Sequence, residues 1–168
     1  MEGELIEVSK KQYKELEAMC LELWHDAYDG LLGSRQVGYM LEKFQSEKAF
    51  EKQTSEENYR YYFIVCGGER AGYCALQPQK DALFLSKLYL AANFRGKNLA
   101  GDILQKILSF GKKEGKEKVY LTVNKENARA IRAYEKFGFV RTQSIVTDIG
   151  GGYVMDDYVY EYNLKTGE

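Results

Sequence analysis

The chain has 168 residues, which suits one domain spanning residues 1–168, and its hydrophobic (45%) and charged (29%) contents exclude a disordered chain as the default. The net charge of −1 excludes the basic surface of a typical nucleic-acid binder, and no apolar run approaches the ~20 residues of a membrane helix. One histidine, three cysteines without metal-ligand spacing and an acidic start without an apolar leader predict a cytoplasmic protein with no metal and no disulfide framework.

Helical periodicity dominates the first third of the chain. Ser9 and Gln12 form the signature of a capping box, and the apolar residues that follow recur at helical spacing. We expect Gly30 and Gly33 to end this helix. The predicted helical stretches are Ser9–Gly33, Ser34–Phe44 and another turn or two within Gln45–Asn58.

From Tyr59 onward, β-branched and aromatic runs alternate with glycine turns and two further helices. Gly67-Gly68 predicts a hairpin turn, because glycine adopts positive φ freely. The predicted strands are Tyr59–Cys66, Ala71–Leu76, Ala82–Leu90, Lys118–Val123, Phe139–Asp148 and Tyr153–Asn163, and the predicted helices are Leu99–Gly115 and Asn124–Phe137. Antiparallel strands followed by a β-α-β-α section indicate the α/β class with a mixed, α+β type of sheet.

The turn after the third strand has the composition of an anion site. Arg95, Gly96 and Lys97 lie between a strand and the start of a helix, where unpaired N–H groups carry partial positive charge. Such a helix start binds phosphate groups, and Gly96 and Ala100 leave room for a pyrophosphate. Asn98 tolerates left-handed geometry. A plain strand-to-helix turn remains the alternative, and neither a P-loop nor a dinucleotide fingerprint occurs.

Three segments, in this order, resemble the GCN5-related N-acetyltransferase (GNAT) superfamily. They are Arg95–Ala100, similar to the family's Q/R-x-x-G-x-G/A loop; Tyr120–Val123 followed by Asn127, Ala130 and Tyr134; and Tyr134–Phe139, similar to its Y-x-x-x-G-F ending. The resemblance implies a central, mostly antiparallel sheet splayed at the cofactor site, with helices on both faces and acetyl-CoA as donor. Asn98 stands where the family prefers glycine, and the run Leu85–Leu88 lacks the glutamate that many relatives use as general base.

The resemblance also implies site residues. Tyr134 would be the catalytic hydrogen-bond donor to the thiol sulfur, and a backbone N–H near Leu88 to Leu90 would bind the thioester oxyanion. Asn127 would bond the pantetheine arm or cap its helix, and both readings are open. The predicted cofactor-binding residues are Leu88, Tyr89, Leu90, Arg95, Gly96, Lys97, Asn98, Leu99, Ala100, Asn127 and Ala130.

The whole length is also similar, more loosely, to the bacterial spermidine/spermine acetyltransferase branch. The segments that carry this likeness are Trp24–Tyr28, Tyr39–Gln53 and Asp148–Val159. The candidate acceptor residues are Tyr28, His25, Tyr39 and Tyr153. His25 also fits a structural role at a helix end. Candidate carboxylates for a cationic amine, chosen by residue type alone, are Asp26, Glu42, Asp148, Asp156 and Asp157.

The sequence therefore predicts an acetyl-CoA-dependent N-acetyltransferase that acts on a primary amine, such as a polyamine, by direct attack on the thioester. A protein or peptide amine as acceptor and a non-catalytic acyl-CoA sensor are the alternatives. A homodimer-forming scaffold protein is a third reading. The predicted partner is a small-molecule amine, with no nucleic acid, no membrane and a homodimer as an open option.

Overall fold

The computed structural model describes residues 2–165, and the chain forms two compact units. Unit 1 comprises the residues up to Gln77 together with Lys87–Gln105, and unit 2 comprises Pro78–Ser86 and the residues from Lys106 onward. The strand Ala82–Leu90 and the helix Leu99–Lys113 each have residues in both units, and so does the strand Glu69–Pro78 through its last residue. The prediction of a single domain over residues 1–168 stays a prediction.

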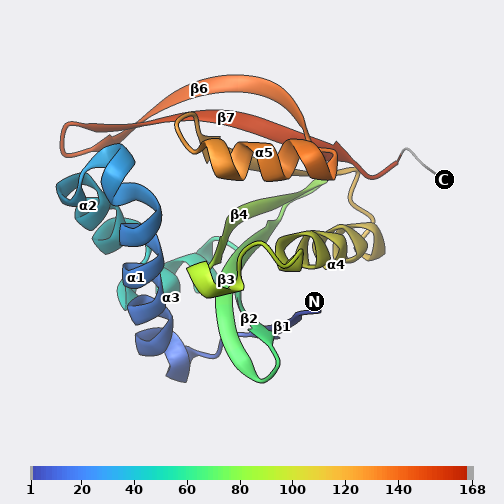
Figure 1. Cartoon of the computed structure of the whole chain (residues 1–168), viewed down its shortest axis with the longest axis horizontal. Coiled ribbons are helices and arrows are strands. Elements are labelled where there is room, and N and C mark those ends of the chain that lie inside the picture. Colours follow the sequence, from blue (N-terminus) through green and yellow to red (C-terminus); the bar gives the residue numbers. More distant parts are fainter. Residues whose placement is uncertain (1, 166–168) are drawn as a thin grey trace. The chain divides into compact units, whose positions relative to one another are not determined.

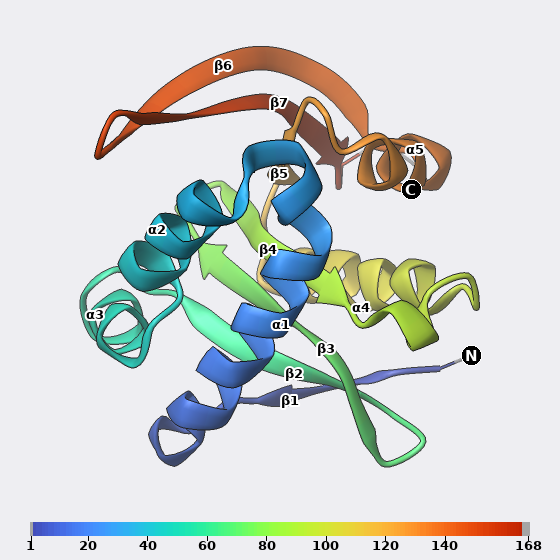
Figure 2. The same ribbon diagram turned by 60° about the vertical axis from the view of Figure 1, so that its left-hand side comes forward.

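Unit 1 contains three antiparallel strands and the helices of the first third of the chain. Strand β1 pairs antiparallel with β2, and β2 pairs antiparallel with β3. Figure 2 shows α1 crossing these three strands, with α2 and α3 beside it. Its elements are β1 (Glu4–Glu7), a 3-10 helix (Lys10–Gln12), α1 (Tyr13–Leu32), α2 (Ser34–Phe44), α3 (Glu47–Glu56), β2 (Arg60–Cys66), β3 (Glu69–Pro78), the end of β4 (Ala82–Leu90), a second 3-10 helix (Ala92–Phe94) and the start of α4 (Leu99–Lys113).

A buried polar chain fastens these helices to the sheet. Nε1 of Trp24, on α1, donates to the Tyr73 hydroxyl at 2.7 Å, and that hydroxyl donates to Oε1 of Gln45 at 2.7 Å. Nε2 of Gln45 then donates to the Tyr61 hydroxyl at 2.8 Å. Because each buried polar group finds a partner, the aromatic residues gain packing without leaving an unsatisfied donor. The network fixes the position of Trp24 above β3.

The same burial predicts alkaline sensitivity. Burial raises the pKa of the Cys20 and Cys74 thiols to about 12, and it also raises the pKa of the Tyr61 and Tyr73 hydroxyls. In the unfolded chain the ordinary values near 9.0 (Cys) and 10.0 (Tyr) return, so the unfolded state loses protons first as pH rises. The free energy of unfolding should therefore hold below pH 9. It should fall above pH 9 through the two cysteines and above pH 10 through the two tyrosines as well, by roughly 1.4 kcal/mol per pH unit for each group.

Urea denaturation at about pH 8 and pH 10.5 measures this effect. A variant with Cys20→Ala and Cys74→Ala should show a shallower fall between the two pH values than the parent protein. Equal stability of the parent at both pH values would contradict the prediction.

Unit 2 contains a parallel strand pair, a long hairpin and α5. The start of β4 pairs parallel with β5 (Lys118–Asn124), β5 pairs antiparallel with β7 (Tyr153–Asn163), and β7 pairs antiparallel with β6 (Val140–Gly150). Figure 1 shows α5 (Ala128–Phe137) lying along the β6–β7 hairpin. The rings of Phe137, Phe139 and Tyr162 pack together there, with centroids 5.5–6.0 Å apart.

The strand order confirms the predicted class. The seven strands form one sheet in the order β1-β2-β3-β4-β5-β7-β6. The β4–β5 pair is parallel, and the β5–β7 pair beside it is antiparallel. This is a mixed α/β arrangement. The pairing of β4 with β5 runs only from Ala82–Lys118 to Leu85–Leu121, although both strands continue beyond it.

Several predicted boundaries were wrong. Gly30 lies inside α1, and Gly33 alone, at φ 83°, ends it. Helix α5 starts at Ala128 instead of Asn124, because Asn124 still pairs in β5 and Asn127 caps the helix. Strand β1 was not predicted, because four residues with two glutamates give too short a pattern. The Ser9 capping box opens the 3-10 helix, where Ser9 N donates to Oε1 of Gln12 at 2.9 Å.

Candidate active site

The loop between β4 and α4, in unit 1, has the backbone that the sequence predicts. Gly96 and Asn98 both have positive φ, at 76° and 59°. Glycine adopts this conformation freely, and asparagine is among the few other residues that tolerate it. Gly96, Lys97 and Asn98 are exposed, whereas Leu99 is buried and anchors the first turn of α4. The loop thus presents its backbone to solvent at a helix start.

The first turn of α4 has backbone N–H groups that no bond of the helix itself uses. Its first helical hydrogen bond joins Asp102 N to the Asn98 carbonyl at 3.2 Å, so the N–H groups of residues 99–101 precede the ladder. The Asn98 side chain folds over this turn, and a Cβ on Gly101 would lie 2.7 Å from Asn98 Oδ1. Sequence reasoning missed Gly101. A glycine three residues after a left-handed asparagine was the available signal.

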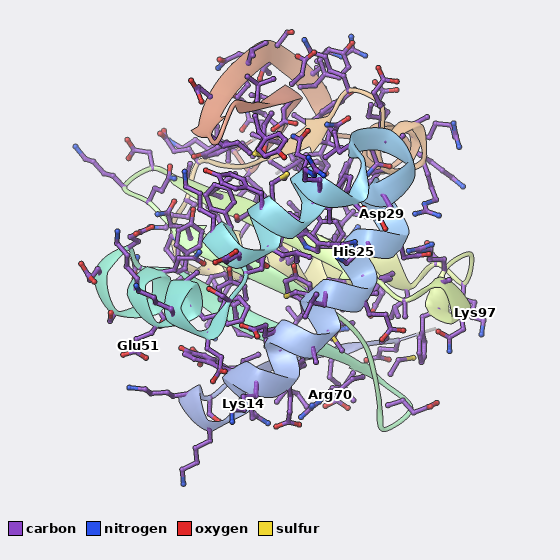
Figure 3. The ribbon with its side chains drawn as sticks, turned by 90° about the vertical axis from the view of Figure 1, so that its left-hand side faces the viewer. Lys14, His25, Asp29, Glu51, Arg70 and Lys97 are labelled. Carbon is purple, nitrogen blue, oxygen red and sulfur yellow. The ribbon has the colours of Figure 1, made fainter. Side chains whose placement is uncertain are left out.

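The Arg95 side chain is engaged by two neighbours within unit 1. Its Nη2 donates to Oδ2 of Asp26, on α1, at 3.0 Å, and its Nε donates to the Leu90 carbonyl at 3.1 Å. The guanidinium therefore ties the loop to α1 and to the end of β4, and Asp26 balances its charge. Lys97, labelled in Figure 3, is the exposed cation of this loop.

The end of β4 packs against α1, which joins a predicted acceptor residue to a predicted cofactor residue. The hydroxyls of Tyr28 and Tyr89 lie 2.8 Å apart, and the Tyr89 ring packs on Trp24 with centroids 5.6 Å apart. Nζ of Lys87 lies 5.9 Å from the Trp24 ring centroid. Of the proposed acceptor residues, Tyr28 is thus held against β4.

Gly72 sets how closely β3 approaches the end of β4. A Cβ built on Gly72 would lie 2.0 Å from the Tyr89 carbonyl oxygen, and Ala91 N donates to the Ala71 carbonyl at 2.8 Å. No side chain fits between the two backbones. Sequence reasoning missed this role, and a glycine inside a strand pattern was the signal for it.

Two other acceptor candidates interact along their own helices. His25 Nδ1 lies 2.6 Å from Oδ1 of Asp29, and Figure 3 shows both on neighbouring turns of α1. The Tyr39 ring lies 5.7 Å from Nζ of Lys43 on α2. The His25–Asp29 contact agrees with the structural reading of His25. An acceptor role for either residue stays a prediction.

Unit 2 carries the other predicted site residues. Oδ1 of Asn127 accepts from Ala130 N at 3.3 Å, which confirms the capping reading and leaves its amide nitrogen for a second role. The Tyr134 ring packs edge-on against Phe139 with centroids 5.8 Å apart. Gly138, at φ 122°, ends α5 directly after Phe137. Tyr153 starts β7, opposite Gly150.

Within residues 2–165, no group of three or more His, Cys, Asp or Glu side chains is placed to hold a metal ion. The same residues include no helix that is long and apolar enough to span a membrane.

The family profile described as Acetyltransferase (GNAT) family matches residues 18–139. The chain belongs to the GNAT acetyltransferase family. The match covers the loop after β4 and extends to Phe139, so it includes each of the three segments that carried the resemblance.

Curated GNAT relatives match part of their length. An uncharacterized N-acetyltransferase of Mycobacterium tuberculosis is 38% identical over 73 residues, which are 43% of this chain and 47% of the relative. Spermidine N(1)-acetyltransferase of Escherichia coli is 30% identical over 95 residues, 54% of this chain and 50% of the relative. The chain thus spans about half the length of these curated relatives.

Among solved structures, the PaiA N-acetyltransferase of Thermoplasma acidophilum in complex with coenzyme A has a TM-score of 0.79 at 19% identity. The comparison covers 97% of this chain and 99% of that one. It shows that this chain has the GNAT fold.

Proposed function

We propose that this chain is an acetyl-CoA-dependent N-acetyltransferase that transfers the acetyl group to a primary amine by direct attack on the thioester. The observation that carries the proposal is the loop from Gly96 to Ala100. Its two positive-φ residues expose backbone at the start of a helix, in a chain of the GNAT family. That arrangement suits a pyrophosphate.

The residues of the loop fit the donor. The N–H groups at the start of α4 suit the pyrophosphate, Lys97 adds a cation, and Arg95 holds the loop in place through Asp26. Leu88 to Leu90 would bind the acyl-bearing arm and the oxyanion. In unit 2, Asn127 and Ala130 would contact the same arm, and Tyr134 would donate a hydrogen bond to the departing sulfur.

The acceptor is a primary amine, with a polyamine or similar small amine as first candidate. The support is the name of the Escherichia coli relative and the likeness of the sequence to that branch. An amine of pKa about 10.4 is protonated at pH 7, and removing its proton costs roughly 4.6 kcal/mol. The site must therefore bind a cation and accept a proton from it. A peptide amine and a catalytically silent acyl-CoA sensor remain the alternatives. A cytoplasmic location and a homodimer stay predictions.

Replacing Tyr134 by phenylalanine tests the catalytic assignment. We expect kcat to fall roughly 100-fold, because the thiolate would leave without its donor, while the affinity for acetyl-CoA changes little. Thiol release with acetyl-CoA and a panel of amines, spermidine first, measures turnover, and calorimetry measures affinity. Tyr62→Phe, on β2, is the matched control and should retain full activity.

The outcomes separate the three readings. The proposal is supported if the parent protein acetylates free amines and Tyr134→Phe lowers that turnover. Turnover on peptides alone would move the acceptor to a protein. Acetyl-CoA binding without turnover on any acceptor would favour a sensor, and an unchanged kcat in the variant would remove Tyr134 from the mechanism.

A further inference from the structure

Asp157 is the buried carboxylate of this fold. It lies on β7 with 5% of its surface exposed, and among residues 2–165 it is the one aspartate or glutamate classed as buried. Burying a carboxylate costs free energy unless the site compensates for it. Such groups therefore gather at functional sites more often than in plain cores.

The other candidate carboxylates differ from Asp157 in their exposure to solvent. Asp26 pairs with Arg95 at 3.0 Å, and Asp156 pairs with Lys125 at 2.6 Å. Oδ1 of Asp148 accepts from Gly150 N at 2.8 Å in the hairpin turn. Glu42 is exposed on α2. Each of these four is an exposed side chain.

Asp157 lies beside the end of β5 that no longer pairs with β4. It lies opposite Asn124, the last residue of β5, and opposite Ile145 on β6, so these three side chains share one face of the sheet. The β4–β5 pairs end at Leu85–Leu121, before this point. Asp157 is therefore paired with a part of β5 that lies beyond the last β4–β5 pair.

The turn that follows Asn124 leads into α5. Asn127 N donates to the Asn124 carbonyl at 3.0 Å, and Lys125 N donates to the Asp156 carbonyl at 3.1 Å, which holds the turn against β7. Asn127 then caps the helix that carries Tyr134. The turn beside Asp157 therefore begins the segment that holds the proposed sulfur donor.

We infer that Asp157 is the carboxylate that binds the ammonium group of the acceptor and takes its proton. This inference rests on the proposed function and supplies the base that the β4 run Leu85-Ser86-Lys87-Leu88 lacks. A proton moves from the ammonium nitrogen to a carboxylate oxygen, and the neutral amine forms its C–N bond to the thioester carbonyl carbon. The C–S bond breaks, and the second proton of the nitrogen reaches the thiolate by way of Tyr134. Asp157 releases its proton to solvent.

The uncharged, equally sized Asp157→Asn tests the inference. At pH 7 we expect kcat/KM for spermidine to fall at least 100-fold with acetyl-CoA affinity unchanged. The difference in kcat/KM between the variant and the parent should become smaller toward pH 10, because a larger fraction of the amine is then already neutral in solution. Glu126→Gln, on the turn after β5 and exposed, is the matched control and should stay within threefold of the parent. Thermal melting of both variants identifies any loss of fold, and Asp157→Glu, which keeps the carboxylate, should recover part of the rate if Asp157→Asn melts early.

Three results would overturn the inference: Asp157→Asn within threefold of the parent at pH 7, a deficit of the same size at pH 7 and pH 10, or an Asp157→Glu variant no more active than Asp157→Asn. The proposed function fails separately, when the parent protein binds no acetyl-CoA or acetylates no amine. In that case calorimetry of spermidine with the protein decides the role of Asp157. Binding that Asp157→Asn weakens at least tenfold supports it, and equal or absent binding overturns it.

Discussion

Replacing Gly96 by glutamate should abolish acetyl-CoA binding at micromolar concentrations, with at least a 100-fold loss of affinity. Gly96 has φ 76° and is exposed at the start of α4, with nothing within 4 Å of a built Cβ. A carboxylate there would stand where the proposal puts the pyrophosphate. Two like charges about 4 Å apart near a protein surface repel by roughly 4 kcal/mol, which corresponds to about three orders of magnitude in affinity.

The control for this substitution is Gly67→Glu. Gly67 is also exposed and has positive φ, at 59°, with nothing within 4 Å of a built Cβ. Both variants carry the same new charge and a similar backbone strain of about 1–2 kcal/mol. Calorimetry should therefore show lost binding for Gly96→Glu and parent-like binding for Gly67→Glu, at matched thermal stability. Parent-like binding by Gly96→Glu would show that the pyrophosphate lies elsewhere.

Replacing Gly72 by alanine should destabilise the protein by roughly 3 kcal/mol or more, the upper end of what overpacking costs. The new methyl group would lie 2.0 Å from the Tyr89 carbonyl oxygen and 3.0 Å from the Leu90 Cα. Both neighbours are backbone atoms, so relief requires β3 and β4 to separate. Because Tyr89 contacts Tyr28 and Trp24, the shift would also disturb the proposed acyl-binding end of β4.

Gly38→Ala is the matched control for this prediction. Gly38 lies within α2 and has nothing within 4 Å of a built Cβ. Alanine in a helix interior is favoured over glycine by about 1 kcal/mol, so this variant should be more stable than the parent. Urea denaturation measures both changes. A Gly72→Ala variant as stable as the parent would contradict the close contact between the two strands.

Local sequence patterns predicted some helices and strands accurately and missed others. The predicted ranges Ser34–Phe44 and Ala82–Leu90 match a helix and a strand of the structure. Apolar residues recur at helical spacing in the first range, and the second is a mostly apolar run. The start of α5 was misplaced by four residues, since nothing local separates the last residue of a strand from the first of a turn. Strand β1 exists through its pairing with β2, and a pairing partner distant in the chain leaves no local signal.

The candidate site divides in the same way. Local chemistry predicted the geometry of the loop after β4: a glycine, an asparagine that tolerates left-handed geometry and two cations stand before a helix start. The backbone angles of Gly96 and Asn98 confirm that geometry. The pairing of Arg95 with Asp26 was decided by tertiary structure, because it joins residues 69 positions apart.

Burial was likewise decided by the fold. The sequence offers Asp26, Glu42, Asp148, Asp156 and Asp157 as equivalent carboxylates, and only the fold buries one of them, Asp157. In the sequence, Gly72 is a residue that disfavours a strand. In the structure, it allows the backbone of β4 to lie close to β3. Periodicity and turn chemistry depend on neighbours in the chain, so the sequence by itself determined most of the elements, the family resemblance and the geometry of the loop. Burial and ion pairing depend on neighbours in space, so only the tertiary structure decided which side chains the site can use.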